Sequence, residues 1–271
     1  MSLARLRPRA STVWIPLALA LTALAPARGE AQSGPEIMQR HRQLHRLKDE
    51  EERLRLRLVS KHGDVKERRV VRWTMTGAGG LDKILLRFLA PRDVENTGLL
   101  TWEARDGDDD QWLYLPATKK SKRIAASGKK NRFMGTDFTY EDLRAENTAV
   151  HAYTLAGEET VEGRACWLIE SAPANEREAA ATGYSKRRLW VRKDNYTLVK
   201  REYHDKRGRL EKIEGLHGHV KVAATAWRAT EIVMQDVQNG TKTQLIVEER
   251  AVDRGLRDDF FSEAELTRVG S

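Results

Sequence analysis

The chain has 271 residues, a net charge of +8 at pH 7 and one cysteine, and charged residues make up 32% of it. A chain of this length forms one or two domains, and so many charged residues exclude a protein that crosses a membrane several times. The lone cysteine, Cys166, excludes an intrachain disulfide and a metal site built from clustered cysteines.

Residues 1–31 have the pattern of a secretory signal peptide. Arg5, Arg7 and Arg9 precede an apolar run at residues 13–25, and small residues before two alanines offer two cleavage sites. The run is shorter than the ~20 residues that span a bilayer. We therefore expect cleavage after Ala27 or Ala31. The mature protein, residues 32–271, should be a single domain that lies in the periplasm and does not span a membrane.

The mature chain begins with a predicted helix and a hairpin. Residues 35–49 fit a helix, because Ser33 can cap it, Glu36 lies three residues on, and apolar residues recur on one face. Leucines at 54, 56 and 58 alternate with arginines at 53, 55 and 57, which predicts a strand with one apolar face. A turn at 62–64 leads to a second strand at 65–75, and further strands are expected at 84–89 and 97–104.

The stretch 110–142 is the centre of the sequence. Trp112 and Tyr114 alternate with two leucines, which predicts a strand buried on both faces, and Pro116 ends it. Seven basic residues follow between positions 119 and 132. Large apolar side chains then return in a polar segment that contains a glycine. Side chains of this size on a loop must fill a core, cover a cavity or bind a partner.

The rest of the chain alternates strands with turns. Strands are expected at 150–156, 164–172, 187–192, 198–203, 210–215, 230–237 and 242–251, and Asn239-Gly240 is the strongest hairpin signal. Residues 175–183 should form a loop or short helix, and Ser262 should cap a short helix at 262–268. About eleven strands with few helices predict a mainly β fold, in which a strongly curved antiparallel sheet forms an open barrel.

Three parts of the central stretch resemble a known family. They are Gln-Trp-Leu-Tyr-Leu-Pro at 111–116, Arg-Ile at 123–124, and Phe-Met-Gly-Thr-Asp-Phe-Thr-Tyr-Glu-Asp at 133–142. They resemble the outer membrane lipoprotein-sorting proteins, which are LolA-like periplasmic carriers often linked to RND-type exporters. The resemblance covers residues 32–271. It implies a half-open barrel with helices on its concave face, and a monomer that has an inner-membrane exporter as a partner.

The sequence lacks the motifs of common enzymes. Arg42 follows His41, so His41 and His45 do not form the zinc-protease motif. His217 and His219 could share a strand face, but a third metal ligand is not evident. The acidic turn at 106–110 lacks the spacing of a calcium loop and is expected to be a solvated hairpin turn. No serine elbow or glycine-rich phosphate loop occurs. We predict a binding protein without enzymatic activity, cofactor or metal.

The predicted function is a carrier of the acyl chains of a lipid or lipoprotein. Burial of each CH2 group contributes about 0.8 kcal/mol, so a hydrophobic cavity can hold such chains without polar recognition. The residues expected to line this cavity are Trp112, Tyr114, Phe133, Met134, Phe138 and Tyr140. The residues expected to contact anionic head groups are Arg123, Lys129, Lys130 and Arg132. For the aromatic residues the alternative is ordinary core packing, and for the lysines it is a solvated loop.

Two other functions remain open from the sequence. A periplasmic sensor of the same fold would form a stable complex with a membrane regulator. A protein that binds envelope polyanions through its basic surface would lose affinity as salt rises. A nucleic acid is not expected as a partner.

Overall fold

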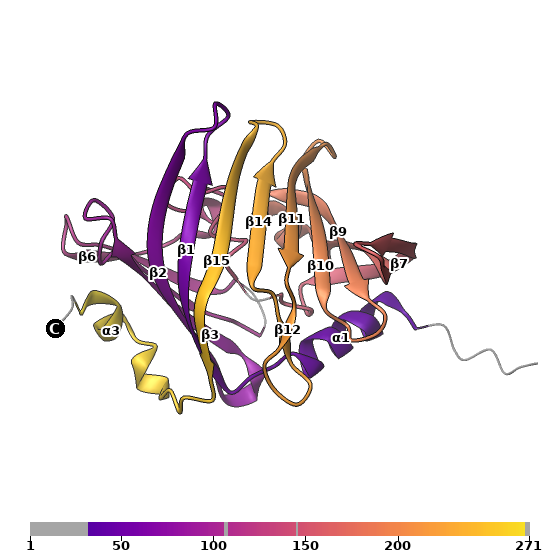
Figure 1. The fold of residues 1–271 in the computed structure, drawn as a ribbon, viewed down its shortest axis with the longest axis horizontal. Coiled ribbons are helices and arrows are strands. Elements are labelled where there is room, and N and C mark those ends of the chain that lie inside the picture. Colours follow the sequence, from indigo (N-terminus) through magenta and orange to yellow (C-terminus); the bar gives the residue numbers. More distant parts are fainter. Residues whose placement is uncertain (1–31, 106–107, 145, 269–271) are drawn as a thin grey trace, which may run out of the picture. The chain divides into compact units, whose positions relative to one another are not determined.

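One large antiparallel sheet dominates the computed structural model, which describes residues 32–105, 108–144 and 146–268 (Figure 1). The thirteen strands of this sheet lie in the order β6-β5-β4-β3-β2-β1-β15-β14-β11-β10-β9-β8-β7, and β12 and β13 pair separately. The described residues belong to one compact unit, Gln32–Ser271. Cleavage of residues 1–31 stays a prediction, because these residues lie outside the described part.

Most strands lie near the positions predicted from sequence, and β6, β12 and β13 were not predicted. The strands are β1 (Asp49–Val59), β2 (Val65–Thr76), β3 (Asp82–Ala90), β4 (Gly98–Trp102), β5 (Asp110–Leu115), β6 (Lys120–Arg123), β7 (His151–Val161), β8 (Arg164–Pro173), β9 (Tyr184–Arg192), β10 (Leu198–Asp205), β11 (Leu210–His217), β12 (Val220–Lys221), β13 (Trp227–Arg228), β14 (Glu231–Asp236) and β15 (Thr241–Val252). The helices are α1 (Gly34–Leu44), α2 (Glu176–Ala181) and α3 (Glu263–Thr267), with 3-10 turns at Ala78–Gly80, Ala126–Gly128 and Asp258–Phe260.

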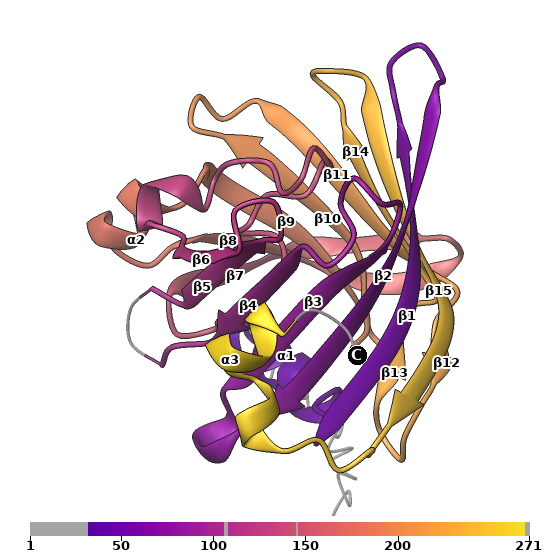
Figure 2. The ribbon, with the colours of Figure 1, turned by 90° about the vertical axis from the view of Figure 1, so that its left-hand side faces the viewer.

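The sheet is strongly curved and does not close into a barrel. Its end strands, β6 and β7, each pair with one neighbour and not with each other. Figure 2 shows the sheet curling around α1 and the chain between β6 and β7. The predicted half-open antiparallel barrel with a few helices is therefore confirmed.

Alternation along β1 sets the two faces of the sheet. Leu54 and Leu56 are buried on the concave face, and Arg55 between them points to the other face. The same alternation places Glu50 and Glu52 on the concave face, where both are buried. This face therefore changes from apolar to charged along a single strand.

The first helix is shorter than predicted. It ends at Leu44, because the strand β1 begins at Asp49 instead of Arg53. The predicted start is confirmed: the Glu36 carboxylate accepts hydrogen bonds from the Ser33 backbone N–H (2.7 Å) and hydroxyl (2.8 Å). The predicted cap of α3 is also confirmed, because the Ser262 hydroxyl accepts a hydrogen bond from the Glu265 N–H.

The concave face holds two separate inserts. One is α1, whose Ile37 and Met38 are fully buried against strands β7 to β10. The other is the plug, residues 124–143, which packs on β1 to β4 and β15 through its apolar side chains. The two inserts therefore cover different parts of the concave face.

Candidate functional site

The aromatic residues of the plug pack into two parts of the concave core. Phe133 is 1% exposed, and its ring centroid lies 5.7 Å from that of Phe88 and 5.5 Å from that of Tyr140. Met134 packs partly buried against the same cluster. Phe138 joins a different cluster, with Tyr184 and two other residues. These contacts are the packing that any protein core makes, whether or not it also binds a ligand.

Trp112 and Tyr114 lie on the opposite face of the sheet from the plug. Their neighbour Leu113 packs against the plug cluster, so alternation turns both aromatic rings to the convex face. There the C-terminal segment covers them, with Phe261 fully buried. The structure therefore does not bring the six predicted cavity residues together. The expected burial of both faces of this strand is wrong at Leu115, which is 36% exposed because β5 is next to the end strand.

Buried ion pairs fasten the plug to the sheet. Asp142 forms an ion pair with Lys212 on β11, and both side chains are almost fully buried. Asp137 accepts hydrogen bonds from the hydroxyls of Thr241 (2.5 Å) and Thr243 (2.7 Å) on β15. Although burial alone would raise the pKa of Asp142, the Lys212 ammonium holds this pKa below its usual value. The acidic residues of the 133–142 signature, which sequence reasoning did not single out, thus hold the plug in place.

The four predicted head-group residues differ in their surroundings. Arg123 is on the end strand β6 and pairs with Asp110. Lys129 is 3% exposed and donates to the backbone oxygen of Asp109 (2.6 Å), so it does not lie in a solvated loop. Lys130 is exposed. Arg132 pairs with Asp137 (2.9 Å) and Asp236.

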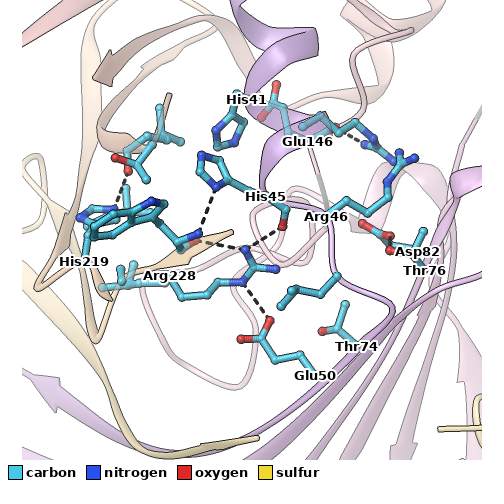
Figure 3. Close-up of a pocket in the computed structure, with 18 of the residues that line it drawn as sticks. His41, His45, Arg46, Glu50, Thr74, Thr76, Asp82, Glu146, His219 and Arg228 are labelled. Atoms are coloured by element: carbon cyan, nitrogen blue, oxygen red, sulfur yellow. Dashed lines mark hydrogen bonds and ion pairs between the residues drawn. The ribbon is translucent and has the colours of Figure 1, made fainter. Parts of the chain in front are cut away.

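A cavity of about 280 Å³ lies beside α1, and none of the plug residues 124–143 lines it (Figure 3). Its apolar floor comes from one residue each of β10, β11, β14 and β15, together with the buried Met38 of α1. The floor residues of the sheet are Leu198, Leu216, Ile232 and Val247. None of the ten predicted ligand residues lines this cavity. Sequence reasoning missed it because each of four strands contributes one floor residue, and the pattern along a single strand does not show which residues share a cavity.

The other walls of the cavity consist mainly of polar and charged side chains. Six arginines contribute to them: Arg42, Arg46, Arg72, Arg201, Arg228 and Arg250. Strand register explains part of this set, because Glu52 on β1 lies directly opposite Arg72 on β2 and Arg250 on β15. The cavity is therefore amphipathic, with an apolar floor and a charged wall.

One wall is an arm, residues 218–230, which includes the unpredicted strands β12 and β13. The arm docks on the end of α1, where Thr225 donates to the Leu44 oxygen (2.8 Å) and Arg228 to the His45 oxygen (2.8 Å). The Trp227 N–H donates to Nδ1 of His45 (3.1 Å), as Figure 3 shows. The joined helix end and arm close one side of the cavity.

Known proteins share this fold and part of this sequence. A family model described as "Uncharacterized protein" matches residues 80–268. The chain is 30% identical to a domain from Vibrio parahaemolyticus that is described as an outer membrane lipoprotein-sorting protein. That match covers 87% of this chain and 98% of the other, with a TM-score of 0.83. The chain belongs to the outer membrane lipoprotein-sorting protein family.

Two further solved structures resemble this chain. A DUF1329 family protein from Desulfovibrio piger is 30% identical, with coverage of 86% of this chain and 97% of the other and a TM-score of 0.80. A LolA superfamily protein from Nitrosomonas europaea shares the fold at 17% identity, with coverage of 87% and 100% and a TM-score of 0.68. No curated protein matches the chain.

The described residues of this chain contain no cluster of three or more metal-binding side chains. His217 pairs with Glu162 (2.8 Å), while His219 lines the cavity and contacts the Leu198 oxygen (3.1 Å). In the acidic turn, Asp109 is buried and accepts from the Ala104 N–H (2.9 Å), so the expected fully solvated turn is wrong at this residue. Residues 106 and 107 lie outside the described part. Across the described helices, none has the length and hydropathy to cross a bilayer.

Burial makes His45 sensitive to acid in this family member. It lowers the pKa of His45 to about 4 from its ordinary value of 6.5. The neutral ring accepts the Trp227 N–H at Nδ1, and protonation of that nitrogen would break this contact. Because the unfolded chain takes up the proton first, the protein loses stability as pH falls from about 6.5 toward 4.

We expect this loss to be on the order of 2–3 kcal/mol in the free energy of unfolding. Denaturant unfolding at pH 7 and pH 4.5 measures it. His45→Asn keeps an acceptor for the Trp227 N–H without titrating, so its pH-dependent loss should be smaller. An equal loss in both proteins would show that His45 does not cause it.

Proposed function

We propose that this protein is a periplasmic carrier that binds acyl chains of a lipid or lipoprotein in the cavity beside α1. The observation that carries the proposal is the apolar floor of Leu198, Leu216, Ile232 and Val247, which lines the cavity. Methylene groups placed on this floor would each contribute about 0.8 kcal/mol. The relative from Vibrio parahaemolyticus, described as a lipoprotein-sorting protein, supports the same function.

The size of the cavity limits what it can hold without moving. At about 280 Å³ it is just below the ~300–1,000 Å³ of typical small-molecule sites. It would take part of one acyl chain, and a larger cargo requires α1 or the arm to move. The arm is the better candidate, because it is held by a few hydrogen bonds, whereas α1 also buries Ile37 and Met38.

The residues predicted from sequence would enlarge this site if the plug lifted. Phe133, Met134, Phe138 and Tyr140 would then cover acyl chains on the concave face, with Lys130 and Arg132 beside their head groups. Trp112 and Tyr114 would contact cargo only after the C-terminal segment moved. Release by the carrier requires either such a change in shape or a tighter acceptor.

The transport step of the proposal concerns the compartment of the protein, the direction of the cargo and the partner. A cleaved leader would place the protein in the periplasm, and cargo would pass toward the outer membrane, with an RND-type exporter as a partner.

The test is mass spectrometry of organic extracts from the protein purified out of its own periplasm. We expect an acyl lipid or acylated peptide in stoichiometric amount. Extracts free of acyl compounds, together with no binding of a fluorescent fatty acid in titration, would contradict the proposal. A stable complex with a membrane regulator in place of lipid transfer to vesicles would instead support a sensor.

A further inference from the structure

The charged wall of the cavity contains a chain of ion pairs with one surplus positive charge. Glu52 accepts from Nε of Arg72 (2.8 Å) and from Nε of Arg250 (3.0 Å). Glu50 lies 2.8 Å from Nε of Arg250 and 2.9 Å from Nε of Arg228. Three guanidinium groups thus share two carboxylates, and the Glu50 and Glu52 side chains are at most 6% exposed.

Other acidic groups near the cavity are engaged elsewhere. Glu103 pairs with Arg42 (2.6 Å), and Glu214 pairs with Arg201 (2.7 Å). Glu146, which lines the cavity, pairs with Arg187 (3.0 Å). Asp82 and Arg46, which have opposite charges, lie on the other side of the cavity from Arg228 (Figure 3). Asp49 turns its carboxylate to the backbone N–H groups of 254 and 255 (2.6 and 2.9 Å). Within the ion-pair chain itself, three guanidinium groups therefore share two carboxylates.

The outer members of the chain keep unused donors beside the cavity. Arg228 uses Nε and Nη1 for Glu50, His45 and its own arm, and within the described residues its Nη2 has no acceptor. Arg72 donates to Glu52 through Nε and Nη2, and its Nη1 has no acceptor among the described residues. Both arginines line the cavity. Guanidinium groups suit carboxylate and phosphate oxygens, and a partly buried surplus charge is costly until an anion neutralises it.

We propose that the cavity selects a single-chain amphiphile with one anionic head group, which Arg228 holds while the chain lies on Leu198, Leu216 and Ile232. This inference rests on the proposed carrier function and adds the charge of the ligand. A carboxylate and a phosphodiester carry the same single charge, so a free fatty acid and a lysophospholipid are both sources of such a ligand.

The test compares a fluorescent fatty acid, cis-parinaric acid, with its uncharged methyl ester. The folded wild-type protein should bind the acid about tenfold more tightly than the ester, because one charge-assisted hydrogen bond contributes at least that difference in binding free energy. Arg228→Gln should remove this preference, because it should weaken binding of the acid about tenfold relative to the ester. Glu50→Gln adds a further surplus charge, so it should increase the preference for the acid. Arg257→Gln, which removes an exposed arginine outside the cavity, is the matched control and should behave like wild type.

The outcomes separate the two proposals. If neither probe binds, the carrier function fails, and this inference with it. If acid and ester bind equally to wild type, the carrier function stands and the charge selection is overturned, even where Arg228→Gln fails to fold. Displacement of the probe by lysophosphatidylglycerol but not by oleate would identify the phosphodiester as the source, and the reverse order would identify the carboxylate.

Discussion

Lys212→Met should lower the free energy of unfolding by about 3–5 kcal/mol, because it leaves the buried Asp142 carboxylate without its cation. Lys212 is 2% exposed, and its Nζ also lies over the rings of Tyr184 (5.0 Å) and Tyr203 (5.2 Å). Asp142 would keep only the Tyr184 hydroxyl (2.8 Å) and the Thr139 N–H (2.7 Å). Denaturant unfolding of wild type and variant measures the difference.

A double variant shows whether the ion pair causes this loss. Lys212→Met with Asp142→Asn removes both charges, so it should be more stable than Lys212→Met alone. Arg257→Met breaks an exposed pair with Asp259 and should have no measurable effect. If the double variant is less stable than the single one, Lys212 acts through its packing on the two tyrosines and not through the pair.

Leu216→Trp should weaken acyl-probe binding by more than tenfold. The larger side chain would extend from the cavity floor into the space of about 280 Å³. Displacing three methylene groups of a ligand costs about 2.4 kcal/mol at 0.8 kcal/mol each, and 1.4 kcal/mol is a tenfold change in Kd. Fluorescence titration of the folded variant gives the change.

The matched control for this prediction is Leu115→Trp. Leu115 is an exposed leucine on β5 and does not line the cavity. Its variant should bind the probe like wild type. Equal binding by Leu216→Trp and wild type, with both folded, would place the acyl chain outside this cavity.

Local patterns were enough to predict the architecture. Leucines alternate with arginines from Arg53 to Leu58, and this local pattern indicates a strand without any information about the neighbouring strands. Turn signals such as Asn239-Gly240 then divide the chain into antiparallel strands. A long run of strands without long helices between them leaves few folds other than a curved sheet or barrel. The family resemblance supplied the helices on the concave face.

Local patterns could not show which residues share a cavity. Trp112 and Phe133 are both large aromatic residues in the central stretch of the sequence. Trp112 packs on the C-terminal segment, whereas Phe133 packs on the concave face of the sheet. That difference depends on which face the C-terminal segment covers, and this is a tertiary choice. Glu50 and Glu52 continue the alternation of Leu54 and Leu56, so the sequence did contain a signal for the charged wall. The prediction missed this signal because it started the strand at Arg53.

The measurement that tests the account most directly is photo-crosslinking with a diazirine-bearing fatty acid, followed by peptide mapping. The account predicts labels on α1 and on peptides from β10, β11 and β14 that contain Leu198, Leu216 and Ile232. Leu216→Trp should lose these labels. Labels confined to the plug, residues 124–143, would contradict the account and place the ligand at the aromatic residues predicted from sequence.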